Sequence, residues 1–285
     1  MGVVLAAFGM NVDHLEPVLA VDLFPEMRLH LLQVLAVLTA EEWNRPTACE
    51  GWSVKDVALH ILGDDIGLLS RQRDGFRSKS SISDWNELVA YVNEQNDLWV
   101  RATRRMSTQV LCAQLEITGN ALYTFFKSLD PYAIGTPVQW VGPEPAPVWL
   151  EIAREYTEYW MHHQHICDAL SITSLKEKRF FAPVLNTFTR ALPRTFRNAP
   201  AQYQTLVKLI ISGEAGGKWH LVYNDGWSLY RNTDLSPSST VIMDAETAWR
   251  LFTKGIDPDV AARRSQIDGD QKLGLKIFDT VAIIA

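Results

Sequence analysis

The chain has 285 residues, of which 47% are hydrophobic, and its formal net charge is −6. This length allows one large or two medium domains, and the acidic balance argues against a nucleic-acid partner, because a phosphate backbone selects basic surfaces. The cysteines Cys49, Cys112 and Cys167 form no CxxC pair, which favours a reducing cytoplasm over a disulfide scaffold. No apolar run reaches the length of a membrane span. We therefore expect a cytoplasmic protein without a membrane partner. Residues 1–12 are interpreted as a disordered lead or as the product of an upstream start codon, with Met10 as another possible start.

Helical spacing of apolar residues dominates the first 170 residues. It predicts helices over residues 22–41, 53–73, 84–106 and 148–170, and a segment that is helical at least in part over 107–130. Ser53 and Asp84 are suited to cap the second and third helices. The Ser-rich segment 74–82 is expected to be a loop, and residues 131–147, with five prolines and two glycines, a long ordered loop or lid. Four main helices indicate a four-helix bundle.

The pattern changes after about residue 172. A helix is expected over 182–197, strands over 206–211, 219–223, 227–231 and 239–243, a helix over 244–254, and a further helix at the end of the chain. The Gly-rich segment 212–217 connects the first two of these strands and is interpreted as a hairpin turn. The sequence therefore predicts an α+β protein with a helical bundle over 13–172 and a smaller α+β domain over 182–285.

The segment 158–165 contains the candidate metal ligands. Glu158 and His162 are four residues apart, so at about 100° per residue their side chains lie roughly 40° apart on one helix face. His165 follows on the same stripe. A carboxylate and imidazoles on one face are natural ligands of a divalent transition metal. A third ligand must come from another element, and His60 is the best candidate, with Asp64 four residues later placed to orient its imidazole.

Each of these residues also has a simpler interpretation. His60 lies in an apolar helical stretch and fits a hydrogen-bonded core histidine, and Asp64 fits a residue that caps or solvates the helix. Glu158 and His162 fit a surface ion pair. His163 is expected on a different, solvent-facing side of the helix, and Cys167 is expected to be a buried, inert thiol. No phosphate-binding loop, nucleotide-binding glycine motif, nucleophile elbow or H-E-x-x-H motif occurs.

Three segments resemble one known family. Residues 52–61 (WSVKDVALHI) resemble a motif of the DinB/YfiT-like superfamily, and more closely of its mycothiol-dependent maleylpyruvate isomerase group. Residues 158–170 (EYWMHHQHICDAL) and 138–143 (VQWVGP) resemble further segments of that group, in the same order along the chain. The second half is more weakly similar to a sterol-carrier-like α+β domain, with residues 267–270 (IDGD) resembling its turn.

The resemblance implies a four-helix bundle that binds a divalent metal through His60, Glu158 and His162, with one position left open for water or substrate. Zinc is the ion expected, and nickel is the second choice. Members of the family use a low-molecular-weight thiol, whose pKa a bound metal would lower. The family often has Asp at the position of His165, so the ligand set or the residues around it differ here.

The favoured function is that of a metal- and thiol-dependent isomerase or transferase acting on a small electrophilic molecule. Asp64 and His165 would support the ligands, Trp140 and Trp149 would wall the pocket, and His165 and Arg263 are the candidates for direct roles in the reaction. The competing hypothesis is a non-catalytic protein that binds a small molecule or lipid on the same fold. The sequence leaves the substrate, the thiol and the oligomeric state open.

Overall fold

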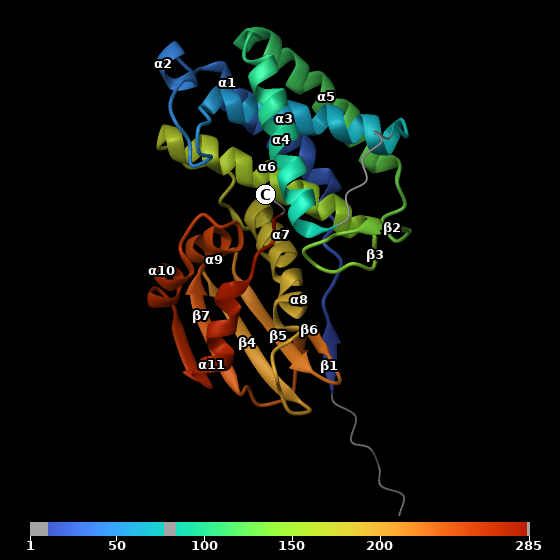
Figure 1. Cartoon of the computed structure of the whole chain (residues 1–285), viewed down its shortest axis with the longest axis vertical. Coiled ribbons are helices and arrows are strands. Elements are labelled where there is room, and N and C mark those ends of the chain that lie inside the picture. Colours follow the sequence, from blue (N-terminus) through green and yellow to red (C-terminus); the bar gives the residue numbers. More distant parts are fainter. Residues whose placement is uncertain (1–10, 77–83, 284–285) are drawn as a thin grey trace, which may run out of the picture. The chain divides into compact units, whose positions relative to one another are not determined.

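The computed structural model describes residues 11–76 and 84–283, which form a helical unit and a sheet unit (Figure 1). The helical unit holds most of the first part of the chain, up to Thr187. The sheet unit holds Phe188–Ala282, together with residues 11–17 and Trp140–Gly142. The expected α+β class, with helices first and a sheet after them, is confirmed. The predicted limits of the two domains, 13–172 and 182–285, stay predictions, and the expected lead over 1–12 and loop over 74–82 lie largely outside the described residues.

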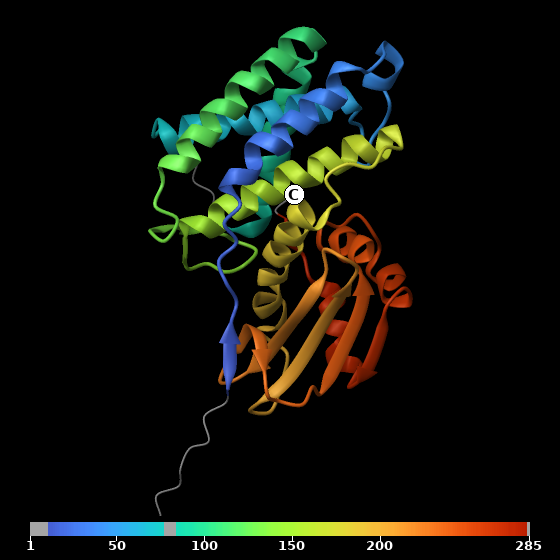
Figure 2. The ribbon, with the colours of Figure 1, turned by 180° about the vertical axis from the view of Figure 1, so that it is seen from behind.

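Helices α1, α3, α5 and α6 contact one another in the helical unit, and α4 packs against α3 (Figures 1 and 2). The predicted helix over 22–41 is confirmed over Phe24–Ala36 and wrong beyond it, where Thr39 caps a new short helix with a reciprocal hydrogen-bond pair to Glu42. The helices of this unit are α1 (Phe24–Ala36), α2 (Ala40–Trp43), α3 (Val54–Leu68), α4 (Trp85–Thr103), α5 (Thr108–Ser128), α6 (Val148–Leu170) and α7 (Lys178–Phe188); a 3-10 turn (Val21–Leu23) precedes α1 and a π-helical turn (Leu69–Arg73) follows α3.

The two predicted helix caps are confirmed. Ser53 accepts a hydrogen bond from the backbone N–H of Asp56, and the Asp56 carboxylate accepts one from the backbone N–H of Ser53. Asp84 accepts from the backbone N–H of Glu87 in the same way. These bonds satisfy N–H groups that have no partner within their own helix, which fixes where α3 and α4 begin.

A single carboxylate connects the helices of the bundle. Asp65 on α3 is fully buried and accepts hydrogen bonds from Arg28 of α1 at 2.7 Å, from Tyr159 of α6 at 2.5 Å, and from Thr118 of α5. A buried charge is tolerated only when it is paired and hydrogen-bonded. Asp65 therefore sets the positions of three helices around α3.

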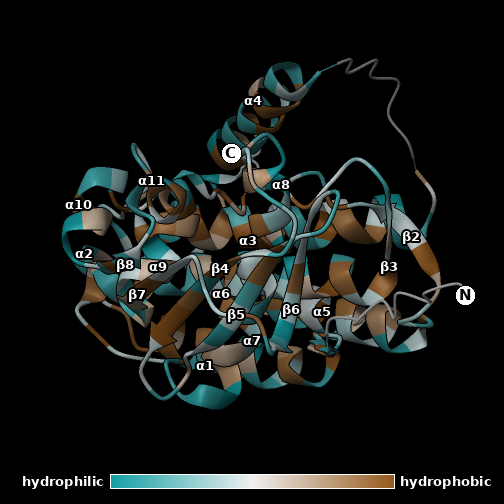
Figure 3. Cartoon of the chain, turned by 90° about the horizontal axis from the view of Figure 1, so that it is seen from below, coloured by the Kyte–Doolittle hydropathy of each residue, from teal (hydrophilic) through white to brown (hydrophobic). Residues whose placement is uncertain are grey.

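Helix α4 approaches α3 through a glycine. The indole N–H of Trp99 donates a 2.7 Å hydrogen bond to the backbone carbonyl of Leu59, and a Cβ placed on Gly63 would lie 2.6 Å from that indole nitrogen. Only a residue without a side chain permits this approach. Figure 3 shows hydrophilic and hydrophobic stretches alternating along the ribbon of α4, as expected for a helix with one packed face.

The segment over 131–147, predicted as a loop or lid, contains a two-stranded antiparallel sheet of β2 (Ile134–Pro137) and β3 (Pro145–Pro147). Thr136 donates hydrogen bonds from its backbone N–H and its hydroxyl to Glu151 of α6. These contacts attach the strand pair to the first turn of α6.

The sheet unit contains six strands in the order β1-β6-β5-β4-β7-β8, antiparallel except for the pair β4 and β7. The predicted hairpin turn between β4 and β5 is confirmed. Helices α8 and α11 lie on one face of this sheet (Figure 1). Figure 2 shows the sheet from its opposite face. The strands are β1 (Val12–His14), β4 (Thr205–Ser212), β5 (Gly217–Tyr223), β6 (Trp227–Thr233), β7 (Ser239–Asp244) and β8 (Gln266–Gly269); the helices are α8 (Leu192–Phe196), α9 (Ala245–Phe252), α10 (Pro258–Arg263) and α11 (Gln271–Leu275).

Several predictions for the second half need correction. The expected helix over 182–197 is interrupted, because α7 ends at Phe188 and a 3-10 turn, Thr189–Ala191, precedes α8. The expected helix at the end of the chain is the short α11 followed by a 3-10 turn, Lys276–Asp279. Strands β1 and β8 and helix α10 were not predicted, because they are too short for a periodic pattern to develop. Among the described residues, no helix is long and apolar enough to cross a membrane.

Candidate metal centre

His60 of α3 and His162 of α6 meet inside the helical unit. Their Nε2 atoms are 3.0 Å apart, although the residues are separated by more than 100 positions in the sequence. Asp64 Oδ2 lies 3.2 Å from His60 Nε2, and Glu158 Oε2 lies 3.8 Å from His162 Nε2. Ligand atoms of His60, Asp64 and His162 all lie within 4.8 Å of one another. The structure thus brings together four residues that the sequence analysis selected.

Burial determines the charge of this cluster. Desolvation, with the neighbouring histidine His165 as a smaller cause, lowers the pKa of His60 to about 4, and desolvation holds the pKa of His162 well below its usual value. Both imidazoles are therefore neutral at pH 7, which is the form that binds a metal. Burial and the nearby Glu155 raise the pKa of Glu158 to about 7, and burial and Glu158 raise the pKa of Asp64 well above its usual value. The two carboxyl groups repel each other when both are ionised, and a cation between them would remove that repulsion.

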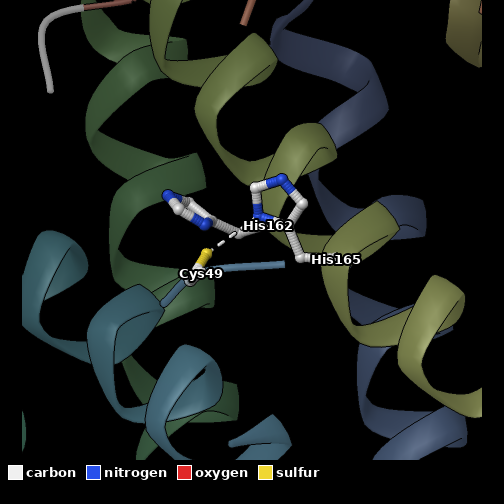
Figure 4. A group of neighbouring side chains, drawn as sticks. All are labelled: Cys49, His162 and His165. Carbon is white, nitrogen blue, oxygen red and sulfur yellow. Dashed lines mark hydrogen bonds between the residues drawn. The ribbon is translucent and has the colours of Figure 1, made fainter. Parts of the chain in front are cut away.

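A second group of donors adjoins His162. Cys49 Sγ lies 3.1 Å from His165 Nδ1, and ligand atoms of Cys49, His162 and His165 lie within 4.8 Å of one another. Figure 4 shows the sulfur of Cys49 directed toward the two imidazole rings. Burial raises the pKa of Cys49 to about 11, against a smaller opposing effect of the hydrogen bond with Thr47. Cys49 was not predicted as part of the site, because a cysteine in an irregular loop gives no spacing from which a contact can be inferred.

His163 is placed wrongly by the sequence analysis. It is buried, 1% exposed, and it lines a cavity of about 10 Å³ together with Arg28 and Tyr159. Neither of its ring nitrogens has a hydrogen-bond partner among the described residues. The expected solvent-facing side does not exist here, because α6 is buried around most of its circumference.

The remaining candidates are not members of these donor groups. Cys167 is buried, and burial raises the pKa of its thiol to about 12, in agreement with the expected inert thiol. Trp149 is half-buried in the first turn of α6. Trp140 and Arg263 belong to the sheet unit, where Trp140 is buried and Arg263 is exposed at the end of α10. The roles proposed for these three residues stay predictions.

The donors present fit a divalent transition metal. Two neutral imidazoles and two carboxylates from α3 and α6 converge within a few ångströms, and such nitrogen and oxygen donors are typical of zinc, nickel and iron sites. In addition, His162 Nδ1 is buried and has no hydrogen-bond partner among the described residues. A buried ring nitrogen left without a partner beside these donors favours an ion over a purely structural network.

A known protein family matches the first part of the chain. The family described as "Mycothiol maleylpyruvate isomerase N-terminal domain" matches residues 25–167. Among solved structures, the mycothiol-dependent maleylpyruvate isomerase and a histidine-to-alanine mutant of it are each 12% identical to the chain, and each comparison covers 81% of this chain and 86% of the other. Their TM-scores are 0.46 and 0.49. No protein with a curated description matches the chain.

Proposed function

Because the chain belongs to the mycothiol maleylpyruvate isomerase N-terminal domain family, we propose that it is an enzyme that binds a divalent metal ion through His60, Glu158 and His162. It would use a low-molecular-weight thiol, which the family description suggests is mycothiol, and act on a small electrophilic substrate as an isomerase or S-transferase. Zinc is the expected ion and nickel the second choice. The family name points to maleylpyruvate, or a similar acid with a cis double bond, as the first substrate to test.

The observation that carries this proposal is the position of His60 Nε2 and His162 Nε2, 3.0 Å apart, with a carboxylate beside each of them. Side chains from two helices far apart in the sequence supply these donors, and both rings are buried. Three protein ligands leave one position for an exogenous group, as in catalytic zinc sites. A bound ion supplies one kind of chemistry here, which is to lower the pKa of an incoming thiol so that it reacts as a thiolate.

The residues around the site bind and orient the reacting groups. Asp64 lies beside His60 Nε2, the nitrogen that faces His162, so its carboxylate is placed next to the proposed ion. The carboxylates of Asp64 and Glu158 would balance the positive charge of that ion. His165 lies next to His162 and is placed to take the proton that the thiol releases. In the isomerase reaction, the thiolate adds to one carbon of the cis double bond, the resulting single bond rotates, and the thiolate leaves as the trans double bond forms.

Metal content tests the first part of the proposal. We would measure it by inductively coupled plasma mass spectrometry on untagged wild type, His162→Ala and the matched control His163→Leu. About one zinc or nickel ion per chain is expected in the wild type and in the control, and none in His162→Ala. An equal metal content in all three proteins would refute the ligand assignment. A metal-free wild type with a bound apolar ligand would support the non-catalytic binding protein instead.

Activity tests the second part. The metal-loaded protein is mixed with maleylpyruvate, with and without mycothiol, and the absorbance change of cis–trans conversion is followed. Conversion that requires both the ion and the thiol would support an isomerase. A thioether product without conversion would support an S-transferase. If neither reaction occurs with any of several thiols and cis-unsaturated acids, the thiol-dependent function is refuted.

A further inference from the structure

Cys49 lies on the side of His162 where His165 is found, and it contributes a sulfur atom to a site so far described by nitrogen and oxygen donors. Its Sγ is 3.1 Å from His165 Nδ1, and both atoms lie within 4.8 Å of a ring nitrogen of His162. His162 Nε2 is in contact with His60, whereas its buried Nδ1 has no partner among the described residues. One donor of His162 is therefore still available for a ligand.

The position of the thiol is fixed by its loop. The backbone N–H of Cys49 donates to the hydroxyl of Thr47, and the carbonyl of Cys49 accepts from the backbone N–H of Trp52. Pro46 and Ser53 form a β-bridge at the base of the loop, directly before the capping box of α3. The same local structure that begins the helix carrying His60 thus also orients Cys49. A thiol held in this way loses little conformational entropy when it binds a ligand.

The distance between Cys49 Sγ and His165 Nδ1 is close to that expected for two ligands of one metal ion. Zinc binds sulfur at about 2.3 Å and imidazole nitrogen at about 2.0–2.1 Å, which places two ligand atoms of a tetrahedral ion roughly 3.3–3.6 Å apart. The observed 3.1 Å between Sγ and Nδ1 is at most about half an ångström shorter. A small rotation of either half-buried side chain would therefore admit an ion between them.

We propose that Cys49, His162 and His165 form a ligand set, with one sulfur donor, for a thiophilic divalent ion. His162 belongs both to this set and to the set that contains His60 and Glu158. This assignment rests on the proposed metal centre and adds that the chain's own thiol occupies a ligand position. An external thiol then competes with Cys49 for the ion. Ions with affinity for thiolate, such as zinc, cadmium and cobalt, bind through this set, whereas magnesium and manganese, which prefer oxygen, do not use it.

Cobalt substitution tests the proposal directly, because a thiolate bound to Co²⁺ gives a charge-transfer absorption in the near ultraviolet that nitrogen and oxygen ligands do not give. The metal-free full-length protein is titrated with Co²⁺ in the absence of any added thiol. The variants are Cys49→Ser and His165→Ala, with Cys112→Ser as the matched control, since Cys112 is also half-buried but lies on α5. Far-ultraviolet circular dichroism verifies the fold of each variant.

The wild type and Cys112→Ser are expected to show the absorption in proportion to bound Co²⁺, at one thiolate per ion. Cys49→Ser is expected to lose it and to regain it when 2-mercaptoethanol is added. His165→Ala is expected to bind Co²⁺ roughly 10- to 100-fold more weakly. Stoichiometric Co²⁺ binding without the absorption in the wild type would overturn this inference and leave the proposed function intact. Failure of the wild type to bind Co²⁺ at all would overturn both.

A measurement on the unmodified protein covers the case in which a variant does not fold. Alkylation of Cys49 and Cys112 by iodoacetamide is followed by peptide mass spectrometry, with and without Zn²⁺ or Cd²⁺. The ion is expected to slow alkylation of Cys49 at least 10-fold and to leave Cys112 unchanged. Equal rates at Cys49 with and without the ion would overturn the proposal.

Discussion

Arg28 donates a 2.7 Å hydrogen bond to Asp65, whose side chain has no solvent exposure. Because Tyr159 and Thr118 donate to the same carboxylate, the pair is part of a buried hydrogen-bond network, and loss of the charge would leave the guanidinium of Arg28 poorly compensated.

We expect Asp65→Asn to lower the free energy of unfolding of the helical unit by roughly 3–5 kcal/mol, as for other broken buried pairs. The measurement is urea unfolding followed by far-ultraviolet circular dichroism. Asp22→Asn is the matched control, because Asp22 pairs with Lys127 on the surface, where an ion pair contributes little. Equal effects of the two substitutions would show that the Asp65 network does not stabilise the bundle.

The buried His163 predicts a pH dependence of stability. Burial, with a smaller effect of His30, lowers its pKa to about 4 from an unfolded value of 6.5. The unfolded chain therefore binds more protons between pH 6.5 and pH 4, so the stability that this group contributes is complete above pH 6.5 and is lost as the pH falls toward 4. The difference corresponds to on the order of 3 kcal/mol.

In urea unfolding of metal-free protein from pH 7 to pH 4, His163→Leu is expected to lose less stability than the wild type. At pH 7 the variant should be at least as stable, because neither ring nitrogen of His163 has a partner among the described residues. Parallel pH curves for the two proteins would contradict the lowered pKa of this histidine.

Two glycines of α3, one turn apart, are expected to respond to alanine in opposite directions. A Cβ at Gly63 would lie 2.6 Å from the indole of Trp99, which is held by its hydrogen bond to Leu59, so Gly63→Ala should cost about 1–3 kcal/mol of overpacking. A Cβ at Gly67 would meet only the end of the flexible Arg71 side chain, so Gly67→Ala should stabilise by up to about 1 kcal/mol through helix propensity. Melting curves of both variants decide this, and a shift of the same sign for both would refute the close packing of α4 on α3.

Zinc is expected to stabilise the metal-free protein. A ligand present at 100 times its dissociation constant adds about 2.7 kcal/mol to the folded state, enough to raise the melting temperature by several degrees. The shift should be absent in His162→Ala and retained in His163→Leu, although these histidines are adjacent in the sequence. Thermal melting with and without added Zn²⁺ is the measurement, and a full shift in His162→Ala would exclude this residue as a ligand.

Helical periodicity predicted much of the fold because it reports which residues face a core. The limits of α6 agree with the predicted 148–170, and Ser53 and Asp84 cap their helices as expected. Periodicity does not report which helices meet. The approach of His60 to His162 depends on how α3 packs against α6. The residues alone therefore offered His60 only as a candidate third ligand, and the family resemblance implied the ligand set.

Asp64, Asp65 and Cys49 show where the sequence alone is insufficient. Spacing selected Asp64, four residues after His60, and passed over Asp65, because nothing in the pattern marks a carboxylate whose partners lie on three other helices. Cys49 lies in a loop whose form depends on individual hydrogen bonds, for which sequence spacing has no signal.

The adjacent positions of Asp64 and Asp65 restrict insertions and deletions in the first part of α3. An α-helix turns by about 100° per residue, so these neighbours face different directions, one toward His60 and one into the bundle. Inserting or deleting one residue between Ser53 and Asp64 would rotate both carboxylates away from their partners at once. A change of length over this stretch would therefore disrupt the proposed metal centre and the Asp65 network together.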